Sequence, residues 1–414
     1  MNTKFGLLVG IGCFAALTAL PSAASSQDWL QGYADAANSG YSSSAMTATP
    51  RLVWGIAMKD ADGTRLHPNS GSAIHNGVLF TSADKNPLKK PGSGWSEFFA
   101  IDTRTGRRLW TFDPHLLGAV HDGLVAVDVA RSQVIYPAHD GNIRALDMST
   151  GALLWTLQVC DTAAQMCDLE GGVTLANGRA YYVSNDWLHA IALDRVHPFE
   201  IWRYPRGEIA HGVATKPVVS GGKVYFGGFG RFWALDELSG RRIWQSSTSL
   251  PKFTYGFDIP HVSGGTVYAS ASRSGSNQTM VTAFDAATGT VRWERVLRLG
   301  FAVKSSAAYG KWFLSFSNGS TDGGVIALDL NTGRTVWTFD HVGSALVAPI
   351  NGGPAAVDNK VIFGASDGTV YMLDQATGLP LWSFATGESM HSPVAVSDGK
   401  FFLGAYKTFR AFGP

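Results

Sequence analysis

The sequence predicts an all-β protein that folds as a single eight-bladed β-propeller, with four antiparallel strands in each blade. Three observations predict this fold. A phrase of the form D-x-x-T-G-x-x-x-W recurs along the chain, its tryptophans are spaced 42 to 56 residues apart, and the 414 residues include 48 Gly and 13 Trp. A period in the forties is typical of propeller blades, and abundant glycine indicates many tight turns.

The repeat accounts for the strands of each blade. Six copies that keep the turn glycine end at Trp110, Trp155, Trp244, Trp293, Trp337 and Trp382. A degenerate copy without Thr-Gly ends at Trp202, and a half-copy, R-L-V-W, ends at Trp54. We expect the Asp to accept hydrogen bonds from the backbone N–H groups ahead of it and the Gly to take a positive φ. Each phrase then forms a turn and an outer strand, and two short apolar runs upstream add further strands.

The number of blades follows from the two ends of the chain. Seven Asp-to-Trp phrases predict seven blades, and the residues after Trp382 supply three strands of an eighth. Its fourth strand is predicted at Arg51 to Trp54, so both ends of the chain share one blade. Such a closure hides two sheet edges. The predicted domains are a signal peptide at 1–24, a lead-in segment at 25–50 and the propeller at 51–414.

With this repeat, the chain resembles the pyrroloquinoline-quinone-like eight-bladed propellers over essentially all of its mature length. The segment D-W-L-Q-G-Y-A-D-A-A-N-S-G-Y is similar to the lead-in of that family. The resemblance implies that the repeat tryptophans dock adjacent blades: Trp54, Trp110, Trp155, Trp202, Trp244, Trp293, Trp337 and Trp382. The family includes quinoprotein alcohol and sugar dehydrogenases and an outer-membrane-assembly scaffold, so the resemblance implies the fold and leaves the activity open.

Charge and the N-terminal residues define the compartment. With 33 basic and 32 acidic residues, the chain lacks the concentrated positive charge that a dedicated nucleic-acid or anionic-membrane binder needs. Lys4, the apolar run Leu7 to Leu20 and the small residues before Ser25 form a signal-peptide pattern that is too short to span a bilayer. We expect a secreted or periplasmic monomer without a transmembrane segment.

Export makes a disulfide possible between the two cysteines of the mature chain. Cys160 and Cys167 lie within one short stretch, C-D-T-A-A-Q-M-C, which a single loop can close. A disulfide is the favoured interpretation, and a metal site, which would need more ligands than two thiols and the flanking aspartates, is the alternative.

The candidate binding site lies on the face that carries the irregular loops. Connections between blades leave from this face, as do the insertion at Lys85 to Trp95 and the aromatic loop at Phe253 to Asp258. Variable loops on a rigid scaffold usually carry binding. Polar residues just before the inner strands are the candidate acids and bases around this mouth: His67, His121, Asp122, Glu170, His211, Lys216, Asp258, Lys304 and His391. The candidate cofactor-binding residues are Asn69, Tyr255 and Asn351.

Three functions are compatible with these residues. The favoured hypothesis is an exported propeller that binds a protein or a saccharide on its loop face without catalysis, because no P-loop, G-x-S-x-G or H-E-x-x-H motif occurs. The first alternative is an alcohol or sugar dehydrogenase that uses pyrroloquinoline quinone with calcium held by Glu170, Asp258 and Asn351. Against it stands the absence of adjacent cysteines and of C-x-x-C-H. The second alternative is a cofactor-free enzyme that uses the His, Lys and Asp residues of the mouth.

Overall fold

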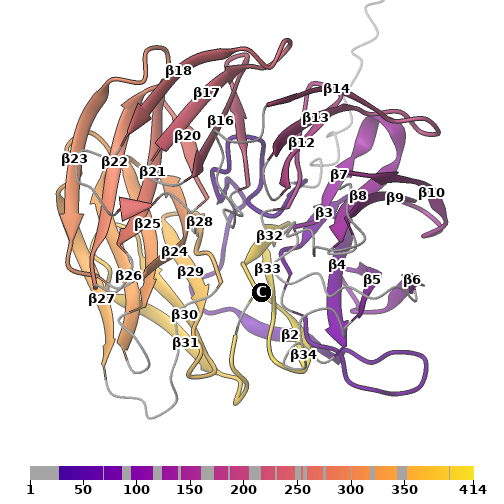
Figure 1. Ribbon diagram of the computed structural model, residues 1–414. Helices are drawn as coiled ribbons and strands as arrows, with labels where there is room; N and C mark the ends of the chain where they lie inside the picture. Colours follow the sequence, from indigo (N-terminus) through magenta and orange to yellow (C-terminus); the bar gives the residue numbers. More distant parts are fainter. Residues whose placement is uncertain are drawn as a thin grey trace, which may run out of the picture.

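The computed structural model confirms the predicted fold class. It describes residues 28–68, 70–85, 95–114, 124–138, 141–159, 172–184, 187–204, 216–228, 231–247, 253–254, 259–273, 277–299, 301–317, 322–342, 352–390 and 392–414. Within these residues the strands form eight sheets of four or five strands. The sheets are the blades of a propeller and stand side by side around a ring (Figure 1).

Each blade runs outward from a short inner strand. Blade 1 consists of β3 (Ala73–His75), β4 (Val78–Lys85), β5 (Trp95–Asp102) and β6 (Arg108–Phe112). Blade 2 consists of β7 (Ala126–Asp128), β8 (Gln133–Ala138), β9 (Asn142–Asp147) and β10 (Leu153–Gln158), with a 3₁₀ turn, η1 (Val129–Arg131), between its first two strands. Blade 3 consists of β11 (Thr174–Ala176), β12 (Arg179–Ser184), β13 (Trp187–Ala192) and β14 (Phe199–Tyr204). Blade 4 consists of β15 (Val218–Ser220), β16 (Lys223–Gly228), β17 (Arg231–Asp236) and β18 (Arg242–Ser247).

The second half of the ring repeats this plan. Blade 5 consists of β20 (His261–Ser263), β21 (Thr266–Arg273), β22 (Thr279–Asp285) and β23 (Val291–Leu297), and β19 (Phe253–Thr254) also pairs with β21. Blade 6 consists of β24 (Phe301–Ala308), β25 (Lys311–Ser317), β26 (Asp322–Asp329) and β27 (Thr335–Val342). Blade 7 consists of β28 (Ala355–Val357), β29 (Lys360–Gly364), β30 (Thr369–Asp374) and β31 (Pro380–Ala385). Blade 8 consists of β32 (Ala395–Ser397), β33 (Lys400–Gly404), β34 (Thr408–Gly413) and β2 (Arg51–Ala57).

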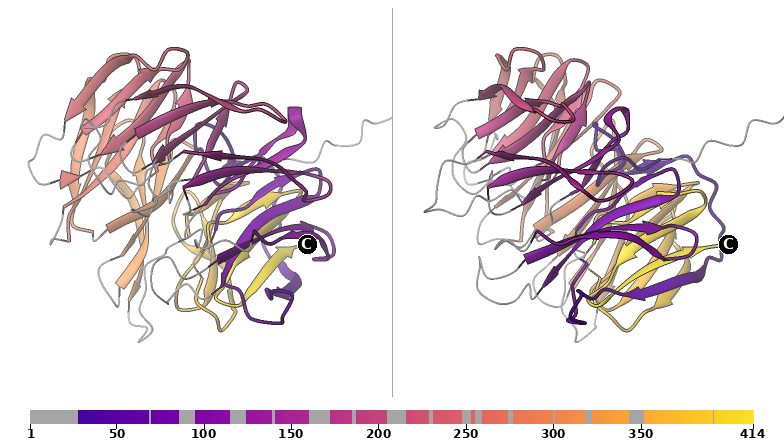
Figure 2. Two further views of the ribbon diagram at one scale, coloured as in Figure 1. Left: turned by 45° about the vertical axis from the view of Figure 1, so that its right-hand side comes forward. Right: turned by 90° about the vertical axis from the view of Figure 1, so that its right-hand side faces the viewer.

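Both ends of the chain complete blade 8, as the repeat count predicts. Strand β2 pairs antiparallel with β34, from Arg51 opposite Gly413 to Ala57 opposite Thr408. Figure 2 shows this indigo strand beside the yellow C-terminal strands in two orientations. The ring is therefore closed by backbone hydrogen bonds between segments that are some 350 residues apart in sequence, which leaves no gap in the circle of blades.

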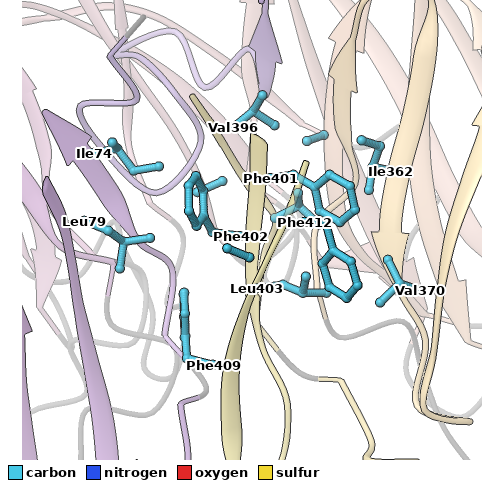
Figure 3. Packing of buried hydrophobic residues seen from close by; sticks show 14 of the residues in the cluster. Ile74, Leu79, Ile362, Val370, Val396, Phe401, Phe402, Leu403, Phe409 and Phe412 are labelled. Carbon is cyan, nitrogen blue, oxygen red and sulfur yellow. The ribbon is translucent and has the colours of Figure 1, made fainter. Parts of the chain in front are cut away.

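The core lies between neighbouring blades. In blade 8, Phe402 and Phe409 point toward blade 1, and Phe401 and Phe412 point toward Val370 and its neighbours in blade 7 (Figure 3). These four phenylalanines are at most 1% exposed. Full burial of such a side chain contributes about 1.5–3 kcal/mol to the free energy of unfolding. The two faces of blade 8 therefore stabilise its interfaces with blade 1 and with blade 7.

The repeated phrase forms the predicted turn. In blade 1, Asp102 Oδ1 accepts hydrogen bonds from the N–H groups of Arg104 and Thr105 at 3.0 and 2.8 Å, and Gly106 has a φ of +72°. The turn glycine also meets the tryptophan of the preceding blade, because a Cβ on Gly106 would lie 2.8 Å from Cδ2 of Trp54. The indole of Trp54 donates to the backbone oxygen of Thr103 at 3.0 Å. One phrase thus contributes both a turn and half of a joint between blades.

The lead-in segment, residues 28–42, runs inside the ring as an inner layer. Backbone N–H or C=O groups of Trp29, Leu30, Ala36, Ala37, Ser39 and Gly40 pair with the inner strands of blades 1, 2, 4, 5, 6 and 7. In blade 3, the side-chain amide of Gln31 bonds both backbone groups of Leu175. Figure 1 shows this indigo segment inside the ring. The segment therefore contacts seven consecutive blades in their order along the inner side of the ring.

Candidate functional site

A small apolar cluster, here called the floor, lies where the inner strands begin. Tyr33 on the lead-in segment packs with Leu124, just before β7, and Ile259, just before β20, and these side chains are at most 7% exposed. Three elements from different parts of the ring thus meet in one buried apolar cluster.

Glycines keep this floor flat. A Cβ on Gly71 or Gly172 would lie 2.2 or 2.7 Å from the side chain of Leu124, and a Cβ on Gly353 would lie 2.6 Å from Cε1 of Tyr33. Real Cβ atoms do not approach so closely, so larger residues at these positions would displace the floor. Glycine at the start of an inner strand lets the lead-in segment and the strand approach one another directly.

Two lysines flank Tyr33. Lys216, just before β15, is 0% exposed, and its Nζ donates to Oδ1 of Asn38 at 2.5 Å and lies 6.0 Å from the centre of the Tyr33 ring. Lys304 in β24 is 7% exposed. A Cβ added to Gly353 would lie 3.3 Å from Cβ of Lys304 and 2.6 Å from Cε1 of Tyr33, so Lys304 and Tyr33 both lie beside this glycine. Burial lowers the pKa of Lys216 to about 7, and the carboxylate of Asp35 opposes that shift. Lys216 can therefore gain or lose its charge near neutral pH beside an apolar, aromatic cluster.

Asn38 anchors this arrangement to the next blade. Its Nδ2 donates to the backbone oxygen of Pro260 at 3.2 Å, and its Oδ1 accepts from Lys216. The side chain is 1% exposed. One amide therefore joins the lead-in segment to blade 4 through Lys216 and to blade 5 through Pro260.

The structure places three of the predicted mouth residues. It brings Lys216 and Lys304 together around Tyr33, whereas His67 lies between blades 8 and 1, where its Nδ1 is 2.7 Å from the backbone oxygen of Tyr406. Burial lowers the pKa of His67. The remaining candidate site residues and the predicted disulfide lie outside the described residues: Asn69, His121, Asp122, Cys160, Cys167, Glu170, His211, Tyr255, Asp258, Asn351 and His391.

Tyr33, Asn38, Leu124, Ile259 and the floor glycines were not among the site residues predicted from the sequence. The lead-in was recognised only as a segment typical of the family, because its residues carry no repeat and no period. The signal that was available is composition: Trp29 and Tyr33 are large aromatic residues in a segment without predicted strands, which indicates burial by other elements.

The described residues contain no group of three or more His, Cys, Asp or Glu side chains arranged to hold a metal ion. Asp60, at the start of the acidic stretch D-A-D-G, instead accepts the backbone N–H of Thr64 at 2.7 Å and pairs with Lys85 Nζ at 2.5 Å. Within the same residues, no helix is long and apolar enough to cross a membrane.

A closed ring of four-stranded blades, with a tryptophan on each outer strand, defines an eight-bladed propeller of the pyrroloquinoline-quinone-like repeat class. The chain belongs to the family described as outer membrane protein assembly factor BamB, whose model matches residues 73–186, 139–310 and 321–412.

Similar proteins of known function are quinone-dependent dehydrogenases. The chain is 29% identical over 148 residues to the quinohemoprotein alcohol dehydrogenase of Comamonas testosteroni. The matched segment makes up 32% of this chain and 18% of that protein. It is 28% identical over 117 residues to the dehydrogenase subunit of the alcohol dehydrogenase (quinone) of Gluconobacter oxydans. This matched segment makes up 26% of this chain and 14% of that subunit. The matches thus span less than a quarter of these relatives.

Solved structures share the fold over most of the chain. The quinohemoprotein alcohol dehydrogenase of Comamonas testosteroni aligns with a TM-score of 0.72 and 16% identity over 94% of this chain and 80% of that one. BamB of Moraxella catarrhalis aligns with a TM-score of 0.62 and 17% identity over 88% of this chain and 100% of that one. At such identities the likeness concerns the fold alone.

These relatives correct the order of the functional hypotheses. The hypothesis favoured from the sequence, an exported propeller that binds a protein or a saccharide without catalysis, is wrong by this comparison. The curated relatives are all named as alcohol or butanol dehydrogenases that work with a quinone or a cytochrome. They favour the alternative, a quinoprotein oxidoreductase.

Proposed function

We propose that this protein is an exported, periplasmic quinoprotein oxidoreductase that oxidises an alcohol with pyrroloquinoline quinone held in the mouth of the propeller. The observation that carries the proposal is the identity of the curated relatives, five of which are named as quinone or quinohemoprotein alcohol dehydrogenases. Bound quinone would supply the two-electron acceptor, which takes two electrons and two protons as the alcohol becomes a carbonyl compound.

The floor of the channel supplies an aromatic and aliphatic layer. Gly71, Gly172 and Gly353 let the chain pack directly against Leu124 and Tyr33, because a Cβ at these positions would overlap their side chains. Aromatic and aliphatic surfaces bind planar rings through dispersion and water exclusion. A side chain at any of these glycines would tilt or displace the layer.

The two floor lysines match the carboxylates of pyrroloquinoline quinone in sign. Lys216 Nζ lies 6.0 Å from the centre of the Tyr33 ring, Lys304 lies beside Gly353, which packs against that ring, and both lysines are nearly or fully buried. A cation removed from water interacts more strongly with an anion than one at the surface. The residues predicted to hold calcium, Glu170, Asp258 and Asn351, lie outside the described residues, and the proposal takes no support from them.

Titration of the purified protein with pyrroloquinoline quinone and calcium tests the proposal. We expect quinone to quench tryptophan fluorescence and to raise the melting temperature, because a ligand at 100 times its dissociation constant stabilises the folded state by about 2.7 kcal/mol. Primary alcohols should then reduce an artificial electron acceptor in a quinone-dependent reaction. The absence of both binding and turnover at saturating quinone would reject the proposal.

A variant of the floor makes the test specific. Gly353→Ala places a Cβ 2.6 Å from Tyr33, whereas Gly55→Ala on β2 meets only Cγ of Arg410 at 3.7 Å, an ordinary contact. We expect Gly353→Ala to weaken quinone binding about tenfold or more, by 1.4 kcal/mol, and Gly55→Ala to bind as the wild type does. Equal binding by both variants would place the ligand away from this floor.

A further inference from the structure

A serine, a histidine and a glutamate lie in a row across the three outer strands of blade 3. Ser184 is the last residue of β12, His189 lies in β13 and Glu200 in β14, and these strands are neighbours in one sheet (Figure 1). Oγ of Ser184 is 2.8 Å from Nε2 of His189, and Nδ1 of the same ring is 3.5 Å from Oε1 of Glu200. The serine and the carboxylate therefore face opposite nitrogens of one imidazole.

The carboxylate determines which ring nitrogen bears the proton. An ionised Glu200 can only accept, so Nδ1 of His189, a buried atom that no other described group hydrogen-bonds, is the protonated nitrogen that faces it. Nε2 keeps its lone pair, and the hydroxyl of Ser184 donates to it. In this tautomer a histidine can take a proton from a serine.

Packing holds the imidazole in place and keeps it neutral. Tyr182 lies directly opposite His189 in the pairing of β12 with β13, and the two rings stack with centres 4.6 Å apart and an angle of 4° between their planes. Burial lowers the pKa of His189, and the interaction with His189 lowers the pKa of Glu200. At neutral pH the ring is therefore an uncharged base beside an ionised carboxylate.

The two ends of the row differ in exposure. The side chain of Glu200 is 38% exposed, and Arg203, which lies over the ring of Trp187, is 3.8 Å from it. Ser184 is 3% exposed and ends β12 at the face that carries the loops. A shielded hydroxyl of this kind admits only a small reactant, and the exclusion of water strengthens the interaction between charges that form during a reaction.

We propose that Ser184 is a nucleophile that hydrolyses a small, neutral carboxylic ester, with His189 as its general base and Glu200 as the residue that positions the imidazole. A nucleophile bonded to a base, which a third group orients in turn, is the arrangement that such catalysis needs. A neutral ester fits better than a phosphate ester, because Glu200 repels an anion. The hydrolysis needs no quinone, so it can fail or succeed independently of the proposed oxidoreductase.

The reaction balances with water as the second reactant. Oγ of Ser184 forms a bond to the carbonyl carbon of the ester while its proton passes to Nε2 of His189. The bond from that carbon to the alcohol oxygen then breaks, and the alcohol leaves with the proton from Nε2. Water repeats the two steps on the acyl group: it gives a proton to Nε2, releases the carboxylic acid and restores the serine hydroxyl.

A fluorophosphonate probe added to the quinone-free protein tests the nucleophile. We expect one phosphonyl group on Ser184, with loss of fluoride, located by mass spectrometry of the peptides. Labelling should be absent at this position in Ser184→Ala and about 100-fold slower or more in His189→Gln, because the general base is lost. Ser397→Ala is the matched control, since Ser397 is 2% exposed and its buried Oγ has no hydrogen-bonding partner among the described residues. A wild-type protein that is not labelled at Ser184 overturns the proposal.

Glu200→Gln covers the case in which His189→Gln lowers the melting temperature, because the Glu200 side chain is partly exposed. We expect this variant to hydrolyse p-nitrophenyl acetate about tenfold more slowly or less. The pKa in its pH–rate profile should also fall, since the imidazolium loses its carboxylate. A glutamate that only stabilises the fold would leave that profile unchanged. Equal rates in the wild type, His189→Gln and Glu200→Gln would refute the assigned roles.

Discussion

Lys216→Met should abolish a rise in stability that the wild-type protein shows between about pH 7 and pH 10. Burial holds the pKa of Lys216 at about 7 in the folded state, against 10.5 for the free side chain. We expect the free energy of unfolding of the wild type to increase over this window by up to about 4 kcal/mol relative to the variant.

The sign follows from proton binding. Below pH 7 the lysine is charged in both states, so the folded protein bears the full cost of a buried ammonium group. Between pH 7 and 10.5 the unfolded chain binds a proton that the folded chain has released, and stability therefore rises with pH. Methionine has a similar length and no charge, so the variant lacks this slope.

Urea unfolding at several pH values from 6 to about 10 measures the effect. The variant loses the hydrogen bond to Asn38 Oδ1 at every pH, a constant cost of about 1–3 kcal/mol that shifts the curve without changing its slope. Lys223→Met is the control, since Lys223 is on the same blade and its Nζ lies at the exposed turn next to Gly221. Parallel curves for the wild type and Lys216→Met would contradict the prediction.

Gly289→Ala should destabilise the propeller by about 3–5 kcal/mol, whereas Gly265→Ala in the same blade should cost only about 1–2 kcal/mol. Both glycines have a positive φ, +74° and +71°, so the backbone strain from a Cβ is the same. They differ in what the Cβ meets: Cδ2 of Trp244 at 2.5 Å for Gly289, and nothing within 4 Å for Gly265.

The additional loss of stability in Gly289→Ala measures the contact of Trp244 in blade 4 with the turn of blade 5. Alanine would push the indole of Trp244 off the turn and break its hydrogen bond to the backbone oxygen of Ala286, 3.2 Å long. Denaturant midpoints give the two free energies, and tryptophan emission should shift to the red only in Gly289→Ala. Equal losses in the two variants would mean that the glycine serves backbone conformation alone.

Together these predictions separate the scaffold from the site. Six copies of the Asp turn, glycine and tryptophan, with a degenerate copy in blade 3 and a half-copy in blade 8, build a ring of similar four-stranded blades. The lead-in segment and the residues before the inner strands differ from blade to blade, and they supply Tyr33, Lys216 and Lys304. Function in such folds resides in the parts that break the repeat.

Most of the fold could be predicted because its determinants are local. The turn of Asp102, Thr105 and Gly106 needs only neighbouring residues, and the spacing of the tryptophans repeats that local unit along the chain. Even closure through Arg51 to Trp54 followed from counting strands, since a blade with three strands needs a fourth.

The sequence alone therefore determined the fold class, the number of blades and the way in which the two ends meet. Each turn is formed by neighbouring residues, and the spacing of the tryptophans counts how often that local unit recurs. Only the tertiary structure decided which residues form the floor. Tyr33, Lys216, Lys304 and Gly353 are scattered over some 320 positions, and they meet because closing the ring brings all inner strands to one axis. It also decided that Lys216 is buried, since burial depends on what the other blades place around a side chain.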